Sequence, residues 1–254
     1  MMVGMEATRR HALYRRGSVT GVLVLLVCLL SAGFQASVEE QRVWQTKGIR
    51  AAARLTGSFR LTLPPPETDI QGLESLVRTS DEIVIGKVES AGSAVTEDDR
   101  SIWSRFRFVV EDSLKGDLDP SDVFHLQIPG GKVEFADGTW AEFKLANRRG
   151  SRTTPPELFR EPVKDERYVV FARRVPGFAG PPPPPGEPVM QWTGSQQSLL
   201  EIGPDGGVTS RGPTGSFTNS IAGMRVAELG RRVRSLVRET VPRFSTLRRC
   251  AGSS

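Results

Sequence analysis

Cysteine and histidine are scarce in this sequence. Its 254 residues include two Cys and two His. Two Cys are too few for a disulfide scaffold or a thiolate-rich zinc site, and two His exclude most histidine-based metal cages. The 26 Gly and 18 Pro are also fewer than a low-complexity chain would hold. We therefore expect an ordinary packed core, no metal centre and no cofactor.

The formal net charge of +5 does not come from a basic domain. Residues 34–204 hold 21 Lys and Arg against 25 Asp and Glu, whereas residues 205–254 hold nine Arg against three acids. The positive excess therefore belongs to the first 33 residues and to the C-terminal segment.

The first 33 residues have the three parts of a secretory signal peptide. Arginines precede an apolar run, and small residues follow it: Arg9, Arg10, Arg15 and Arg16, then Val19–Leu30, then Ser31, Ala32 and Gly33. The arginines stay on the cytoplasmic side while the apolar run enters the membrane. We therefore expect a signal peptide over residues 1–33, cleaved after Gly33, and a periplasmic or secreted protein.

An uncleaved N-terminal membrane anchor is the alternative interpretation of the same segment. Residues 17–38 contain no charged side chain, and about 20 residues suffice to span a bilayer. If the leader is retained, residues 17–38 would contact the membrane and anchor the protein in the inner membrane through a single helix. The apolar core is shorter than that span, which favours cleavage.

A folded domain is predicted over residues 67–240, after a polar, Pro-containing linker over residues 34–66. At its start, the segment 69–80 has apolar residues at helical spacing, and Asp69 can serve as the N-cap. This pattern indicates one short helix before the main body of the domain.

Apolar residues then recur with a period of two, which is typical of β-strands. The pattern predicts strands over residues 82–88, 101–111, 122–128, 133–135, 139–145, 167–173 and 198–202, and one at Val208. Asp137-Gly138 and the segment 204–207 are hairpin turns. The Pro-rich segment 180–188 must be an exposed loop, because proline cannot donate to a sheet ladder. This many short strands favours a sandwich or a small barrel.

An amphipathic helix is predicted near the C-terminus, with Asn219 or Ser220 as its N-cap. Its apolar stripe is Met224, Leu229, Val233, Leu236 and Val237, and its arginines are Arg225, Arg231, Arg232, Arg234 and Arg238. These arginines are candidates for contact with an anionic surface. The alternative is a helix docked on the barrel with solvated arginines. Residues 241–254, including Cys250, are predicted to be a flexible tail.

Few residues suggest metal or catalytic chemistry. Asp117, Asp119 and Asp122 could hold Ca²⁺, but the Gly and the distal Glu of an EF-hand loop are missing, which favours ordinary turn aspartates. His125 is the only His beyond the leader. It lies on the polar face of its strand without a nearby nucleophile, so we expect a solvent-facing His and no catalytic residue.

Two other sets of residues leave alternatives open. A carboxylate-based hydrolase would need two of Asp98, Asp99, Asp117 and Glu134 in one cleft. Trp103, Trp140 and Trp192 could stack bases, as aromatic residues do in some barrels, or could belong to the core. We expect no nucleic-acid partner, because export removes most opportunity for one.

Four segments carry a resemblance to known proteins: residues 80–88 (SDEIVIGKV), 108–116 (FVVEDSLKG), 128–131 (IPGG) and 165–171 (DERYVVF). In this order they resemble a group of exported bacterial proteins of unknown role and, more distantly, netrin-type modules and tissue inhibitors of metalloproteinases. The resemblance covers about residues 69–202 and implies an OB-type barrel. The bacterial group commonly has Gly at the position of Asp165.

Protease inhibition is not implied by this resemblance. Tissue inhibitors bind the protease zinc through a disulfide-bonded N-terminal Cys, and no Cys lies near the predicted mature start. We therefore predict a mainly β protein, with a small OB-like (netrin-like) barrel, a short N-terminal helix and one C-terminal amphipathic helix. Its predicted function is that of an exported, non-enzymatic binding module of the bacterial cell envelope. The partner would be an envelope protein or an anionic surface. A periplasmic hydrolase and a membrane-tethered accessory protein are the alternatives.

Overall fold

The computed structural model describes residues 36–64, 72–148, 157–175, 177, 180, 182–194, 196–210, 216–221 and 223–240. The predicted leader, the proposed cap Asp69 and the predicted tail 241–254 lie outside these residues. Within the described part of the chain, no helix is both long and apolar enough to cross a membrane.

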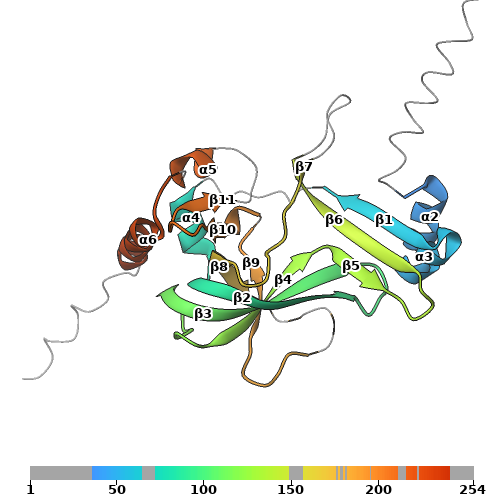
Figure 1. The fold of residues 1–254 in the computed structure, drawn as a ribbon, viewed down its shortest axis with the longest axis horizontal. Helices are drawn as coiled ribbons and strands as arrows, with labels where there is room; N and C mark the ends of the chain where they lie inside the picture. The colour runs from blue at the N-terminus through green and yellow to red at the C-terminus, as the bar shows by residue number, and fades with distance from the viewer. Residues whose placement is uncertain are drawn as a thin grey trace, which may run out of the picture.

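Strands dominate the described structure (Figure 1). They are β1 (Ser58–Leu63), β2 (Glu82–Val95), β3 (Ile102–Lys115), β4 (Val123–Pro129), β5 (Gly131–Glu134), β6 (Trp140–Arg148), β7 (Glu157–Leu158), β8 (Arg167–Arg174), β9 (Val189–Trp192), β10 (Leu199–Ile202) and β11 (Val208–Ser210). The helices are α2 (Val38–Lys47), α3 (Ile49–Thr56), α4 (Leu73–Thr79), α5 (Ser216–Ile221) and α6 (Val226–Thr240).

Five of the strands close into a barrel. The sheet runs in the order β8, β2, β3, β4, β9, and β9 pairs again with β8. The pair β4–β9 is parallel and the other four pairs are antiparallel. This order and these directions are those of an OB-type Greek-key barrel. The prediction of a mainly β, OB-like barrel is therefore confirmed.

The alternation of apolar residues fills the barrel interior. Large side chains from three strands are fully buried there, among them Phe106, Phe108, Phe124, Leu126 and Tyr168. The rings of Phe108 and Phe124 stack with their centroids 5.2 Å apart. Each such side chain contributes about 1.5–3 kcal/mol through burial. Three register shifts along the β2–β3 pair let these long strands bend around the core.

A second apolar cluster joins the barrel to the helices α4, α5 and α6. The predicted stripe of the C-terminal helix packs into this cluster, with Leu229 and Val233 fully buried. The predicted start of that helix was wrong: Asn219 and Ser220 lie in α5, and α6 begins at Val226. The break occurs because Gly223 has a φ of 76° and Arg225 forms a β-bridge with Gly207.

Residues 36–64 are not the predicted linker. They form α2, α3 and β1, and β1 runs parallel to β6. Ser37 and Glu40 build a capping box at the start of α2. The buried side chains of α3 are Ile49, Ala52 and Ala53. Because two of the three are alanines, the sequence shows only a weak apolar pattern in this segment. Together with Phe59 and Phe143, these three side chains form a third apolar cluster.

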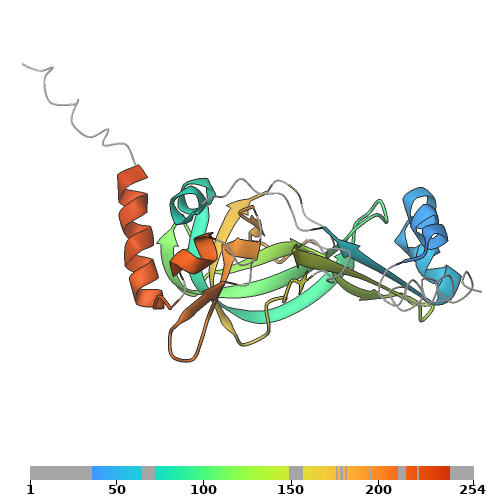
Figure 2. The same ribbon diagram turned by 90° about the horizontal axis from the view of Figure 1, so that it is seen from above.

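The molecule is elongated. Figures 1 and 2 show α6 at one end of the barrel and the pair α2–α3 at the opposite end. The hairpin β2–β3 extends from the barrel toward α2–α3, where Ile102 is buried in the third cluster and Val95 packs against it. The turn between these two strands, residues 96–101, therefore lies where the barrel meets α3.

Candidate functional site

The outer face of the barrel carries a strip of polar side chains on β3, β4 and β9. Because alternate residues of a strand point to opposite faces, the neighbours of the buried Phe106, Leu126 and Met190 point outward. They are Arg105 and Arg107 on β3, His125 and Gln127 on β4, and Val189 and Gln191 on β9, with Trp103 at the start of β3. Gln127 pairs in register with Arg105 on one side and with Gln191 on the other.

Two loops rise above this strip and turn it into a groove of about 740 Å³. One is the β2–β3 turn and the other is the Pro-rich loop between β8 and β9. The lining residues are Val95, Thr96, Glu97, Asp98, Trp103, Gln127, Gly177, Gly180, Pro182 and Gln191. The volume lies within the range of about 300–1,000 Å³ typical of ligand pockets.

The position of the groove matches the binding face of OB-type barrels. In that fold, ligands lie over the second and third strands, between the loop joining strands one and two and the loop joining strands four and five. The corresponding strands here are β3 and β4. The corresponding loops are the β2–β3 turn and the β8–β9 loop. The groove is therefore the first candidate for a functional site.

The β2–β3 turn is held in one conformation by local hydrogen bonds. Asp98 Oδ1 accepts from the Thr96 hydroxyl at 2.5 Å and from the Arg100 amide at 3.1 Å. The hydrogen bond from Thr96 is the main cause that lowers the pKa of Asp98. The backbone oxygen of Asp99 accepts from the Ile49 amide at 2.8 Å, which fixes the turn to α3. This wall of the groove is thus formed before any ligand arrives.

The β8–β9 loop is fixed near its C-terminal end by Glu187. Its carboxylate accepts from Nε and Nη2 of Arg107, at 3.2 and 2.8 Å, and lies 2.7 Å from His125 Nε2. Arg107 also pairs with Glu89. The hydrogen bonds from Arg107, with a smaller contribution from His125, lower the pKa of Glu187 to about 2. The loop is therefore clamped to the barrel by ionic hydrogen bonds.

The prediction of a solvent-facing His125 was wrong. Its side chain does lie on the outer face of β4, but the residue is only 7% exposed because the β8–β9 loop covers it. No periodicity in the sequence signals such a cover, since the loop comes from a distant segment. The structure gives His125 a carboxylate partner, Glu187, and neither residue lines the groove.

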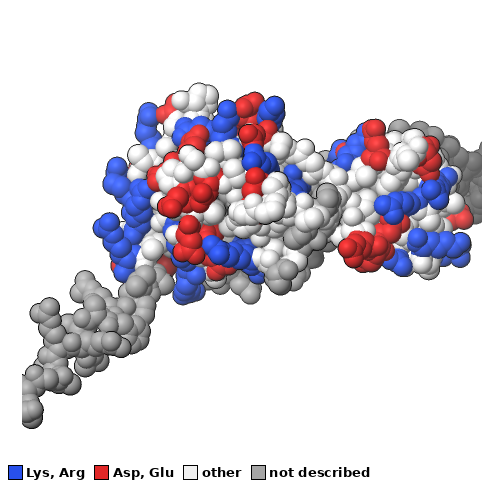
Figure 3. Space-filling view, turned by 90° about the horizontal axis from the view of Figure 1, so that it is seen from below, with Lys and Arg blue, Asp and Glu red and all other residues white. Residues whose placement is uncertain are grey.

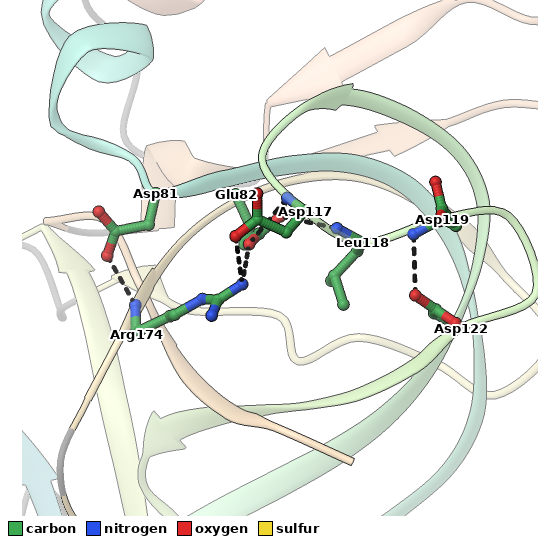
Figure 4. A network of polar contacts seen from close by, with 7 residues as sticks. All are labelled: Asp81, Glu82, Asp117, Leu118, Asp119, Asp122 and Arg174. Carbon is green, nitrogen blue, oxygen red and sulfur yellow. Dashed lines mark hydrogen bonds and ion pairs between the residues drawn. The ribbon is translucent and has the colours of Figure 1, made fainter. Parts of the chain in front are cut away.

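Asp117, Asp119 and Asp122 do not converge on a common point (Figure 4). Asp117 Oδ2 lies 3.2 Å from Arg174 Nη2, whereas the Asp119 amide donates to Asp122 Oδ2 at 2.8 Å farther along the same loop. Among the described residues, no three His, Cys, Asp or Glu side chains are grouped so that they could hold a metal ion. Asp117 thus contacts Arg174, and Asp122 accepts a hydrogen bond from the backbone of its own turn.

The centre of this network is Glu82, which the sequence analysis placed inside a buried strand without a role. Its side chain is only 2% exposed. It accepts from the Asp117 amide at 3.1 Å and lies 2.7 Å from Arg174 Nη2 (Figure 4). Glu82 thus ties the β3–β4 loop to the end of β8. Its contacts are all within the fold, which indicates a structural role.

The four carboxylates of the hydrolase hypothesis occupy three parts of the structure. Asp98 and Asp99 share the β2–β3 turn, but Asp98 lines the groove whereas Asp99 Oδ2 accepts from the Arg50 amide of α3 at 3.1 Å. Asp117 follows the opposite end of β3. Glu134 lies on β5, where it pairs with Lys132 at 3.1 Å and is 75% exposed. The cleft that this hypothesis requires is not formed by these residues.

A second cavity of about 290 Å³ lies beside β5 and β6. Two carboxylates that the sequence analysis missed, Glu142 and Glu161, line it together with Lys132 and Lys144. Glu142 lies 3.4 Å from Lys144 Nζ and 3.6 Å from Arg60 Nε. Loss of hydration at the cavity, and then the charge of Glu142, raise the pKa of Glu161 although part of its side chain stays exposed.

The arginines of α6 and Arg225, which lies just before it, differ in their contacts. Arg234 donates to Asp112 at 2.7 Å, and Arg225 donates to the backbone oxygen of Asp205 at 2.7 Å. Arg231, Arg232 and Arg238 are exposed. Figure 3 shows Lys and Arg atoms gathered along the end of the molecule that α6 forms. Contact of these arginines with an anionic surface stays a prediction.

The three tryptophans of the barrel and the second sheet differ in burial and location. Trp192 is 6% exposed and belongs to the barrel core, whereas Trp103 and Trp140 are half-buried. Trp103 lines the groove, and the Trp140 ring lies under Arg60 and Lys132 on the β1–β6–β5 sheet. The sequence analysis named Trp103 for stacking but missed Gln127 and Gln191, whose approach depends on the pairing of β4 with β9.

Comparison with models of protein families, with curated proteins and with solved structures gave no match to this chain. The relationship to netrin-type modules therefore stays a prediction, and the functional argument depends on the groove itself.

Proposed function

We propose that the protein is an exported, non-enzymatic binding module of the bacterial cell envelope and that it recognises its ligand in the groove above β3 and β4. The observation that carries the proposal is the location of this groove between the two loops that bind ligands in OB-type barrels. The β2–β3 wall is held by the backbone of Asp99, and the C-terminal end of the β8–β9 loop is held by Glu187.

The fixed β2–β3 turn favours binding, because little conformational entropy of this wall is lost when a ligand enters. The lining residues offer a ring, amides, a hydroxyl and carboxylates, which are groups that orient a ligand. Covalent catalysis requires a nucleophile activated by a base. The Thr96 hydroxyl does donate to Asp98 in the groove, but the lowered pKa of Asp98 makes this carboxylate a weak base. Recognition is therefore the role that this surface supports best.

Export is the part of the proposal that depends on the sequence alone. The arginines, the apolar run and the small residues of the first 33 residues support it. Mass spectrometry of the N-terminus of the protein isolated from its native cells tests this part. A start near Phe34 is expected, and a retained Met1 would favour the membrane-tethered alternative instead.

Hydrogen–deuterium exchange of the full-length chain tests the binding role. The chain is mixed separately with the polysaccharide, the protein and the lipid-vesicle fractions of a bacterial envelope. We expect one fraction to slow exchange at residues 95–98 and 182–191, and Trp103→Ala to abolish this protection. Protection confined to α6 would contradict the proposal and favour recognition of an anionic surface.

A hydrolase has one observation in its favour, the shared cavity of Glu142 and Glu161. Loss of hydration raises the pKa of Glu161, and a carboxyl that keeps its proton can serve as a general acid beside a second carboxylate. Turnover of glycoside, ester and peptide substrate panels by the full-length chain tests this second candidate. Activity that Glu161→Gln abolishes would replace the non-enzymatic role.

A further inference from the structure

We propose that the groove binds a neutral oligosaccharide, which rests on the binding role proposed above and names its ligand class. Three properties of the lining carry the inference: its charge, its aromatic ring and its polar side chains. Each is a property of described residues that face the same space of about 740 Å³.

The charge of the lining is unsuited to nucleic acid. Single-stranded nucleic acids are held by Lys and Arg along their phosphates. Among the ten described lining residues there is no Lys or Arg, whereas Glu97 and Asp98 are acids. Of the neighbouring cations, Arg107 is paired with Glu187 and Glu89, outside the groove. Arg105 lies beside Gly180 but is not a lining residue. Phosphates placed in the groove would meet carboxylates.

Trp103 supplies a flat apolar surface. The residue is half-buried and lies at the beginning of β3, so part of its ring is accessible where the strand enters the groove. One face of a sugar ring carries C–H groups, and such a face packs against an aromatic ring and removes apolar area from water. A neutral sugar gains this contact without the desolvation cost that a charged group would pay.

Gln191 supplies a polar group. It is half-buried on β9, whereas its register partner Gln127 on β4 is only 1% exposed and belongs to the buried floor of the groove. A carboxamide has two donor hydrogens and an acceptor oxygen, and a sugar hydroxyl both donates and accepts. The carboxylate of Glu97 adds an acceptor for further hydroxyls. Together these groups suit a ligand that has many hydroxyls and no negative charge.

Isothermal titration of the full-length chain tests the inference. The probes are cellotetraose, maltotetraose, tetra-N-acetylchitotetraose and, as the anionic comparison, a twelve-nucleotide oligothymidine. We expect at least one tetrasaccharide to bind and the oligothymidine not to bind. Trp103→Ala should weaken that binding by about tenfold or more, as loss of an aromatic stacking contact does. Trp103→Phe should restore most of the affinity, which separates loss of the ring from misfolding.

Trp140→Ala is the matched control, because Trp140 is also half-buried but lies on β6 outside the groove. It should change the affinity by less than about twofold, whereas Gln191→Ala should weaken binding by about fivefold. If no tetrasaccharide binds, or if Trp103→Ala has no effect, the inference is wrong. Binding of oligothymidine that depends on Trp103 would overturn the ligand class but leave the binding role intact. Protection confined to α6 in the exchange experiment would instead contradict the binding role itself.

Discussion

His125 Nε2 lies 2.7 Å from Glu187 Oε2, which joins strand β4 to the end of the Pro-rich β8–β9 loop. The same carboxylate accepts two hydrogen bonds from Arg107 on β3. Glu187 is therefore the residue through which one wall of the groove is fixed to the barrel. Its removal should affect both the stability of the fold and the shape of the groove.

Glu187→Gln should lower the free energy of unfolding by about 1–3 kcal/mol, because it weakens hydrogen bonds to a charged acceptor whose side chain is mostly buried. Urea unfolding measures the change. Glu134→Gln is the matched control, since Glu134 is 75% exposed and pairs with the partly exposed Lys132. This control should lower the free energy of unfolding by less than about 0.5 kcal/mol. Equal effects of the two variants would contradict the clamp.

The contribution of Glu187 should depend on pH in a defined direction. Its pKa is lowered in the folded protein, from 4.5 to about 2. A lowered carboxyl pKa stabilises the fold fully above the unfolded value, and this stabilisation is lost as the pH falls from about 4.5 toward 2. The difference in unfolding free energy between wild type and Glu187→Gln should therefore be larger at pH 7 than at pH 3. An equal difference at both pH values would rule out this linkage.

The barrel could be predicted from the sequence because its strands alternate strongly. Phe106, Phe108 and Val110 mark one face of β3, and Phe124 and Leu126 mark one face of β4. The short strand β9 gave no such signal, because four residues are too few to show a period. The helix α3 was missed for a related reason, since its buried face consists largely of alanine.

The groove could be predicted only in part. Trp103 stands out as an aromatic residue on a polar face, but Gln127 and Gln191 are ordinary polar residues until barrel closure brings them together. Asp165 shows the opposite case. The resemblance places Gly at this position, and the structure explains that preference, because Asp165 has a φ of 68°, which glycine adopts without strain.

The arginines of α6 should differ in their effect on stability. Arg234→Gln should lower the free energy of unfolding by about 0.5–1 kcal/mol through loss of the partly exposed pair with Asp112. Arg232→Gln, on the exposed side of the same helix, should change it by less than about 0.3 kcal/mol. Urea unfolding at low and at 1 M salt measures both. The effect of Arg234→Gln should shrink at high salt, and a larger loss for Arg232→Gln would be inconsistent with this assignment.

Gly116 should be among the positions least tolerant of a larger residue. It follows β3 with a φ of 104°, and a Cβ there would overlap the Glu82 carboxylate and lie 2.9 Å from the backbone oxygen of Asp81. Glu82 cannot retreat, because it is buried and held by the Asp117 amide and by Arg174. We expect Gly116→Ala to lower the free energy of unfolding by about 3–5 kcal/mol.

Gly138→Ala separates this overlap from backbone strain. Gly138 also has a positive φ, 80°, but a Cβ there would meet nothing within 4 Å. Gly138→Ala should therefore lower the free energy of unfolding by about 1–2 kcal/mol, which is the strain of a left-handed residue alone. Urea unfolding of both variants gives the difference, and adding Glu82→Ala to Gly116→Ala should produce less than additive loss, because the overlapping carboxylate is then absent. Equal costs at the two glycines, or strict additivity with Glu82→Ala, would show that the buried carboxylate does not confine the β3–β4 loop.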